Sequence, residues 1–291
     1  MQNRILKRKP VAAALLLLLL TLPGCHLSRI FGWKNDHPVQ RALPVDATLA
    51  EMTDHLNTER SRMMGWRSNE LKISVSGKGM VTPKLKANLS VESPRNLRLV
   101  ATSLRGKEVD FGSNAERFWF WARAERPDII LTGSHAGLAR QELLELPFPP
   151  AWLMEALGVV PLDTSRAQLL RDQDSQDRVQ LISNQVIEGR PVQRVMTVDL
   201  VLGQIVQHSL YDEQSQLIAR ARMSDFRRPA GNDTASRLPH RIELNWPRSG
   251  MNLMLRMSEI DANPQFNAHT WRVLQDPNCR ILDLDQEVSQ P

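Results

Sequence analysis

The amino-acid sequence predicts a mainly β protein with a few helices, in which an unclosed antiparallel β-barrel, or half-barrel, is covered by helices. Apolar and polar residues alternate with a period of two through much of the chain after Trp66, as expected for strands with one buried face. Short turn signals separate these stretches, and helical signals interrupt them twice. About a dozen strands are too many for a small flat sheet, because twisted sheets of this size curl into a barrel or a half-barrel.

The first predicted element of this domain is a helix. Thr48 and Glu51 have the spacing of a capping box, in which each residue satisfies a backbone N–H of the first turn. Apolar residues then recur at helical intervals as far as Gly65: Leu49, Met52, Leu56 and Met63.

Strands follow the helix, because the period changes to two after Trp66. Turn residues such as Pro94 and the pair Arg105-Gly106 divide the stretch into short segments, which is typical of an antiparallel meander. We predict strands at residues 71–76, 85–92, Leu97–Leu104, Glu108–Gly112, Arg117–Arg123 and Ile129–Thr132.

A second helix interrupts the meander. Pro149 and Pro150 suit a helix start and Gly158 suits a helix end, so we predict a short helix over Ala151–Leu157. Residues 163–178 are polar and predict an exposed loop or a short solvated helix. Alternation then returns, and we predict strands at Val179–Val186, Val192–Val201, Gln204–Tyr211, Ile218–Phe226, His240–Trp246, Met251–Ile260 and Thr270–Leu284.

The N-terminus has the pattern of an export signal over residues 1–24. Basic residues precede the apolar run Val11–Leu22, which is too short to span a bilayer, since about 20 residues are needed. The sequence Leu22-Pro23-Gly24-Cys25 that follows resembles the bacterial lipobox, which implies that Cys25 becomes the lipidated N-terminus of the mature chain. The acyl chains would then anchor the protein without a transmembrane helix. The alternative is an ordinary signal peptide that leaves Cys25 as a thiol.

Residues 25–45 predict a lipid-anchored tether, and residues 46–291 the open barrel domain. Removal of the signal lowers Lys plus Arg from 37 to 33, against 32 Asp plus Glu, so the net charge becomes about +1 and indicates no nucleic-acid partner. Cys279 would be the only other cysteine, which excludes a disulfide framework.

The sequence predicts neither an enzyme nor a metal or cofactor site. The seven histidines lack metal-ligand spacing, and no P-loop or nucleophile elbow occurs. Glu108 and Asp110 share one face of a predicted strand, where paired carboxylates could act as acid and base, but we interpret them as residues of the solvated side.

The ordered series of strand segments resembles the LolA/LolB superfamily of periplasmic lipoprotein carriers and acceptors. The segments that carry the resemblance span residues 46–286: "SVESPRNLRLVAT", "GSNAERFWFW", "SLYDEQSQLIARARMSDF", "LPHRIELNWPRSGMNLMLRMSEID" and "WRVLQDPNCRILDLD". The resemblance implies an unclosed antiparallel β-barrel that is lined with apolar side chains, is covered by helices and holds acyl chains. Leu104 is the nearest match to the exposed leucine of the membrane-bound acceptor.

The family carries aromatic residues near the cavity, and "FWFW" at residues 118–121 fills that position. Alternation places Phe118 and Phe120 on one face and Trp119 and Trp121 on the other, without showing which face is inner. A second apolar row lies in the segment after residue 250. The candidate ligand-binding residues are Phe118, Phe120, Trp121, Trp152, Leu153, Met251, Leu253 and Leu255; the alternative is that they are ordinary core residues.

Two functions fit the sequence. In the first, a lipoprotein anchored to the membrane on the periplasmic face of the cell envelope binds acyl chains or lipoproteins and transfers them. In the second, a structural or scaffold lipoprotein of the envelope has a barrel filled by its own side chains and a protein partner of unknown identity. His26, rather than Asp, follows Cys25, which favours the outer membrane over the inner one if sorting is of the enterobacterial type.

Overall fold

The computed structural model describes residues 40–77, 80–81, 84–123, 128–138, 150–171, 175–187, 190–229 and 236–287. From Arg41 onward they belong to one unit, Arg41–Pro291. The predicted signal at residues 1–24, Cys25 and most of the predicted tether lie outside them. In chain order the elements are α3 (Leu49–Ser61), β1 (Gly65–Gly77), β2 (Met80–Val81), β3 (Leu85–Glu92), β4 (Asn96–Ser103), β5 (Gly106–Ser113), β6 (Arg117–Ala122), β7 (Ile129–Ser134), α4 (His135–Leu138), α5 (Pro150–Ala156), β8 (Gln168–Arg171), β9 (Arg178–Ile187), β10 (Arg190–Asp199), β11 (Gln204–Tyr211), β12 (Leu217–Arg227), β13 (Leu238–Trp246), β14 (Met251–Met257), β15 (Asp261–Ala262), η1 (Ala268–Trp271), β16 (Arg280–Asp283) and α6 (Leu284–Glu287).

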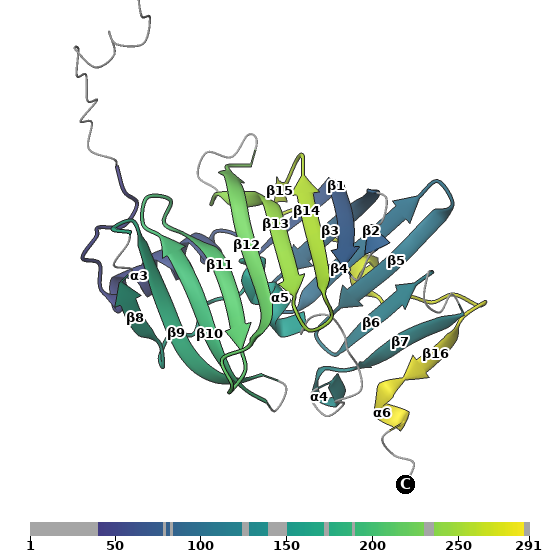
Figure 1. Cartoon of the computed structure of the whole chain (residues 1–291). Coiled ribbons are helices and arrows are strands. Elements are labelled where there is room, and N and C mark those ends of the chain that lie inside the picture. The colour runs from purple at the N-terminus through teal and green to yellow at the C-terminus, as the bar shows by residue number, and fades with distance from the viewer. Residues whose placement is uncertain are drawn as a thin grey trace, which may run out of the picture. The chain divides into compact units, whose positions relative to one another are not determined.

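All described strands belong to a single sheet (Figure 1). Its order is β16-β7-β6-β5-β4-β3-β1-β14-β13-β12-β11-β10-β9-β8, with β2 and β15 paired to β1 off this path. Neighbours are antiparallel except β16 and β7, which are parallel. In the described part of the chain, β16 and β8 do not pair with each other, so the sheet is not closed into a barrel. The predicted fold class, an unclosed half-barrel with a few helices, is therefore confirmed.

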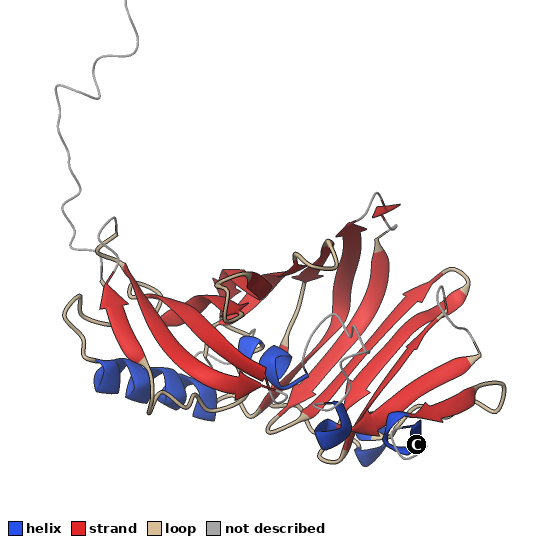
Figure 2. Cartoon of the chain, turned by 60° about the horizontal axis from the view of Figure 1, so that its bottom comes forward, coloured by secondary structure: helices blue, strands red, loops and turns tan. Residues whose placement is uncertain are grey.

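The two faces of the sheet have different surroundings, and we call the face that packs against α3 and α5 the inner face. A continuous apolar core joins buried side chains of α3 and α5 to alternate residues of the strands from β1 to β5 and from β9 to β14. Figure 2 shows the sheet curving around α5. Helix α3 lies beside the end of the sheet whose edge strand is β8. Because one face of every strand needs cover from water, the helices complete a core that the sheet alone leaves open.

The start of α3 follows the predicted cap. The Thr48 side chain accepts a hydrogen bond from the Glu51 backbone N–H, and the Glu51 carboxylate accepts one from the Thr48 backbone N–H. The Thr48 backbone N–H and the Thr48 hydroxyl both donate to the Glu51 carboxylate, so they favour its charged form and lower the pKa of its carboxyl group, against a smaller opposing effect of burial. The capping box is confirmed, and it fixes the end of α3 that precedes the core residues Met52 and Leu56.

The outer face of β4–β6 is covered by the C-terminal part of the chain. Trp119 and Trp121 pack there against Ile130, with Val273, Leu274 and Cys279 beside them. Burial, followed by the nearby Asp276 carboxylate, raises the pKa of the Cys279 thiol, which keeps it protonated.

Asp110 lies beneath this cover with 0% of its surface exposed. Its carboxylate accepts hydrogen bonds from Arg98 at 2.9 Å, Lys107 at 2.9 Å and the Trp119 indole at 3.1 Å. Burial raises the pKa of Asp110, but the bonds from Arg98, Lys107 and Trp119 outweigh burial and hold it below its usual value. The prediction that Glu108 and Asp110 lie on a solvated side is therefore wrong for Asp110, because residues far along the chain cover that face.

Two other local predictions are wrong. Residues 163–178, predicted as an exposed loop or a short solvated helix, contain the edge strand β8. This polar strand pairs with β9 and so joins the sheet. The predicted long strand Thr270–Leu284 is replaced by η1, an irregular cover segment and the short strand β16. Pro277 lies between them, and proline cannot donate a backbone hydrogen bond to a ladder.

Gly112 is required by the packing of Trp119. An ideal Cβ on Gly112 would lie 2.0 Å from Cζ2 of the Trp119 ring. We expect Gly112→Ala to lower the free energy of unfolding by about 1–3 kcal/mol, because the buried indole must shift from Asp110. The control Ala115→Ser lies exposed in the β5–β6 turn and should change stability by less than about 0.5 kcal/mol in the same denaturant titration. Equal stability of the two variants would contradict this packing.

Candidate functional site

The candidate site lies on the inner face, under the short helix α5. This helix has seven residues, and Pro150 stands at its first position, where a missing N–H costs nothing. Gly158 follows it with φ +78°, a left-handed conformation that ends the helix. Trp152 is 1% exposed and Leu153 6% exposed, and both belong to the apolar core of the sheet. A helix that is apolar on most of its surface is stable only when it is buried. The space around which the sheet curves provides this burial, and α5 fills it.

The C-terminal end of α5 is held by donors from two other elements. Arg60 of α3 donates to the Glu155 carbonyl at 3.2 Å and to the Val160 carbonyl at 2.5 Å. The Trp66 indole of β1 donates to the Leu157 carbonyl at 3.3 Å. Because the last carbonyls of a helix lack partners within the helix, these bonds satisfy acceptors that would otherwise be buried without one.

Arg194 of β10 reaches α5 from the inner face of the sheet and is 1% exposed. Its guanidinium donates to the Glu155 carboxylate at 2.9 Å, to the Asp163 carbonyl at 2.6 Å and to the Ser183 hydroxyl at 3.2 Å. Burial, opposed by the Glu155 charge and reinforced by the Arg194 charge, lowers the pKa of the nearby Arg60 to about 10. Two guanidinium groups therefore bind Glu155, that of Arg60 at its carbonyl and that of Arg194 at its carboxylate.

His208 of β11 lies in the same cluster. Its ring is 5.7 Å from that of Trp152, and its Nε2 lies 3.8 Å from the Glu155 carboxylate. Burial lowers the pKa of His208 well below its usual value, and the positive charges of Arg194 and Arg60 lower it further, so the ring is neutral. Within the described residues, neither Nε2 of His208 nor Nε1 of Trp152 has a hydrogen-bond partner, although both atoms are buried.

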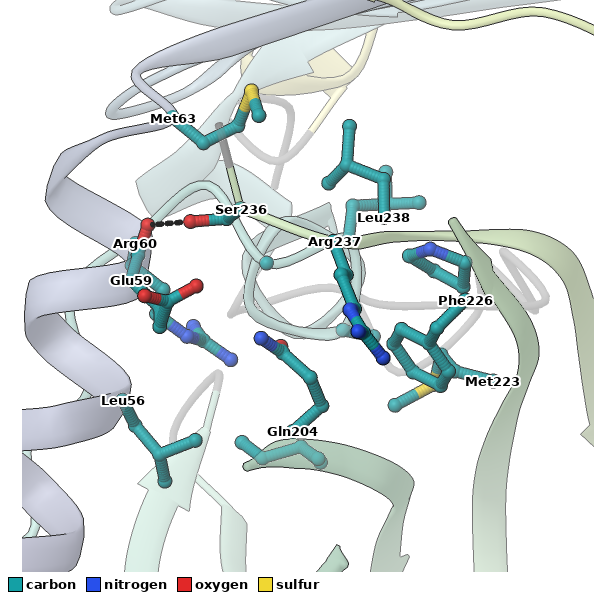
Figure 3. A pocket seen from close by; sticks show the side chains of 15 residues that line it. Leu56, Glu59, Arg60, Met63, Gln204, Met223, Phe226, Ser236, Arg237 and Leu238 are labelled. Carbon is teal, nitrogen blue, oxygen red and sulfur yellow. Dashed lines mark hydrogen bonds between the residues drawn. The ribbon is translucent and has the colours of Figure 1, made fainter. Parts of the chain in front are cut away.

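A small cavity opens between α3, the end of α5 and the strands β11–β13 (Figure 3). Its volume is about 40 Å³, which has room for only a few water molecules. Ligand pockets usually measure about 300–1,000 Å³, so this cavity is too small to hold an acyl chain in this conformation. Figure 3 also shows the Ser236 hydroxyl donating to the Glu59 carbonyl, at 2.6 Å, at the rim. The lining residues that Figure 3 labels are Leu56, Glu59, Arg60, Met63, Gln204, Met223, Phe226, Ser236, Arg237 and Leu238.

The structure brings together six of the eight predicted ligand-binding residues. The six belong to the inner apolar core or pack against it: Phe120, Trp152, Leu153, Met251, Leu253 and Leu255. Phe118 lies in a separate cluster with Leu284 of α6, and Trp121 lies on the outer face beneath the C-terminal cover. Phe118 and Trp121 therefore do not line the space under α5. Leu104 is 107% exposed on the β4–β5 turn.

The charged residues of the site were not found from the sequence. Arg194 had a signal, since it occupies the apolar phase of an alternating strand between Val192 and Met196. Arg60 and Glu155 had none, because polar residues on short or amphipathic helices are usually solvated.

Two further features of the described chain bear on its chemistry. No group of three His, Cys, Asp or Glu side chains is placed there to hold a metal ion. None of the described helices is long and apolar enough to cross a membrane.

The fold defines a class of protein in which an open antiparallel sheet curves around covering helices. Two solved structures share it: a domain assigned to outer membrane lipoprotein sorting from Vibrio parahaemolyticus, and a LolA superfamily protein from Nitrosomonas europaea. The first has a TM-score of 0.52 and 8% identity over 75% of this chain and 95% of its own. The second has a TM-score of 0.50 and 13% identity over 78% of this chain and 98% of its own.

The chain therefore has the fold of the LolA superfamily, which confirms the resemblance seen in the sequence at the level of the fold. No family model matches the chain, and no curated protein matches its sequence.

His208 should make stability depend on pH. The unfolded chain takes up a proton at this residue near its ordinary pKa of 6.5, whereas the folded chain does so only at lower pH. The unfolded state then binds more protons, so stability should fall below about pH 6.5, by up to about 1.4 kcal/mol per pH unit. In urea titrations between about pH 7.5 and pH 5, the free energy of unfolding should depend less on pH for His208→Gln than for the parent protein.

The control is His269→Gln, because His269 lies exposed on η1. The free energy of unfolding of that variant should depend on pH as that of the parent protein does. A pH dependence that His208→Gln leaves unchanged would contradict a neutral, buried His208.

Proposed function

We propose that this protein is a lipid-anchored envelope protein that binds an acyl chain, of a lipid or of a lipoprotein, on the inner face of its sheet, in the space that α5 occupies here. The observation that carries the proposal is α5 itself. It is a seven-residue helix that inserts Trp152 and Leu153 into the core of a sheet that is not closed. An acyl chain offers the same kind of surface to the same wall and would restore the apolar burial that α5 gives up.

The polar end of the site suits the head of such a ligand. The rings of Trp152 and His208 lie 5.7 Å apart, and each has a buried nitrogen without a partner, so a neutral ester or amide carbonyl would give a buried N–H there an acceptor. Binding sites of this kind are mostly apolar with a few polar groups that fix orientation. The fold neighbour assigned to lipoprotein sorting supports a ligand of this class.

A second function is favoured by the packed interior. The cavity between α3, the end of α5 and β11–β13 measures only about 40 Å³, and buried side chains of α5 pack against the sheet beside it. This packing suits a structural or scaffold lipoprotein whose barrel is filled by its own side chains and which has a protein partner. The two functions differ in whether α5 leaves its place when an acyl chain is present.

Lipid content separates the two functions. The chain from residue 26 onward keeps every described residue and lacks the anchor. After native purification, extraction and native mass spectrometry should find stoichiometric acyl lipid, and a fluorescent fatty acid should bind the delipidated protein. An empty protein that takes up no probe, together with a stable partner in cross-linking, would contradict acyl binding and favour the scaffold.

Two adjacent residues of β14 provide a matched pair for this assay. Leu253 faces inward opposite Val75 and Leu244, and Met254 faces outward opposite Ser74 and Glu243. Both are half-buried. Leu253→Gln should weaken binding of the fatty-acid probe about tenfold, because it removes apolar contact, whereas Met254→Gln should leave it unchanged. Equal loss of affinity in both variants would show that the probe does not bind at the inner face.

The anchor is the second part of the proposal. We expect the mature chain to begin at a lipidated Cys25, on the periplasmic face of the envelope and at the outer membrane rather than the inner one. The mass of the N-terminal peptide should show the acyl groups. Cys25→Ala should abolish lipidation, and the control Cys279→Ala should retain it. An unmodified Cys25 or an intact Met1 would contradict the anchor.

A further inference from the structure

The outer face of the sheet carries a hollow of about 480 Å³ over β12, β13, β14 and β1. It lies on the side of the sheet opposite α5 and is separate from the acyl site. Arg220 and Arg222 of β12 and Arg256 of β14 belong to its lining, as do the hydroxyl groups of Ser74 and Ser76. One carboxylate, that of Glu243, is present, and it already pairs with Arg241.

Basic residues continue from the hollow across the sheet in one register. Arg241 lies opposite Arg256, Arg256 opposite Lys72, and Lys72 opposite Lys86, so four adjacent strands place like charges side by side. Directly opposed like charges destabilise a sheet. The row therefore gathers positive charge beside the hollow without stabilising the sheet.

The arginines of the hollow have few partners of their own. Within the described chain, Arg222 donates its Nε to the Gln207 side chain at 3.2 Å, and no hydrogen bond or ion pair is present for the side chains of Arg220 or Arg256. The Nε of Arg220 is buried and has no acceptor. Buried polar atoms are nearly always paired, so this atom indicates a missing acceptor in the hollow.

We propose that this hollow binds a phosphate group of a phosphorylated ligand. Three guanidinium groups against one carboxylate leave a charge excess of two in the lining. A phosphate monoester carries about −1.5 to −2 and offers three acceptor oxygens, whereas a carboxylate carries only −1 and two oxygens. Guanidinium groups also match the geometry of phosphate oxygens through paired N–H donors. The hollow is large enough to hold a phosphate together with the organic group that bears it.

The source of the phosphate can be a soluble compound or the headgroup of a lipid, and two probes separate them. Inorganic pyrophosphate titrated into the chain from residue 26 onward, followed by calorimetry, tests the soluble source. Sedimentation with phosphatidylcholine vesicles that do or do not contain phosphatidic acid, whose headgroup is a phosphate monoester, tests the lipid source. Acetate serves as the carboxylate probe in the first assay.

Single charge removals place the binding in the hollow. Arg220→Gln and Arg256→Gln should each weaken binding of pyrophosphate, or of the phosphatidic acid vesicles, about tenfold or more, because each removes charge-assisted hydrogen bonds. The control Arg178→Gln removes the same charge from an exposed position at the start of β9, outside the hollow. It should leave binding unchanged. Arg256 is exposed, so its variant should fold even if Arg220→Gln does not.

Each outcome decides the proposal. Loss confined to the two hollow variants supports it, and the probe that binds shows whether the phosphate is soluble or lipid-borne. It is overturned if neither probe binds, if acetate binds as tightly as pyrophosphate, or if Arg178→Gln loses as much affinity as the hollow variants. The fatty-acid assay is independent of these measurements, because its ligand occupies the other face.

Discussion

The closed inner face depends on the carboxylate and carbonyl of one residue, Glu155. Its carboxylate accepts from Arg194 of the sheet, and its carbonyl accepts from Arg60 of α3. Arg60 and Arg194 are far apart in the sequence, so the position of α5 depends on both α3 and β10. The short helix would not be stable alone, because helices of this length lack the hydrogen bonds to repay their ordering.

The sheet uses its two faces for different purposes because its side chains alternate. Inward residues such as Leu71 and Ile73 build the core with α3 and α5, and outward residues of the same strands meet solvent or cover. At one end of the outer face, the C-terminal segment buries Asp110 and Trp119; at the centre, the basic hollow is left open. The site that we propose for an acyl chain and the one that we propose for a phosphate therefore lie on opposite faces of one sheet.

The sequence predicted what local periodicity and caps determine. The strands from β3 to β7 and from β9 to β14, the Thr48 cap and helix α5 all follow from patterns within a few residues. Contacts between residues that lie far apart in the sequence could not be predicted from such local patterns. Alternation placed Phe120 and Trp121 on opposite faces, but only the contacts of Phe120 with Phe111, and of Trp121 with the C-terminal cluster, show which face is inner. Arg60 meets α5 only through the fold, so no local pattern indicated its role.

The polar cluster at Glu155 suits the proposed replacement of α5 by an acyl chain. Burying a charged pair costs nearly as much in lost hydration as the attraction returns, so the bonds from Arg194 and Arg60 specify the position of α5 more than they stabilise it. Most of the favourable free energy comes from burying side chains such as Trp152 and Leu153, at about 1.5–3 kcal/mol for a large apolar side chain. A bound acyl chain would return that apolar contact while the arginines regained water. Exchange between helix and ligand therefore needs a far smaller change in free energy than the burial of α5 alone suggests.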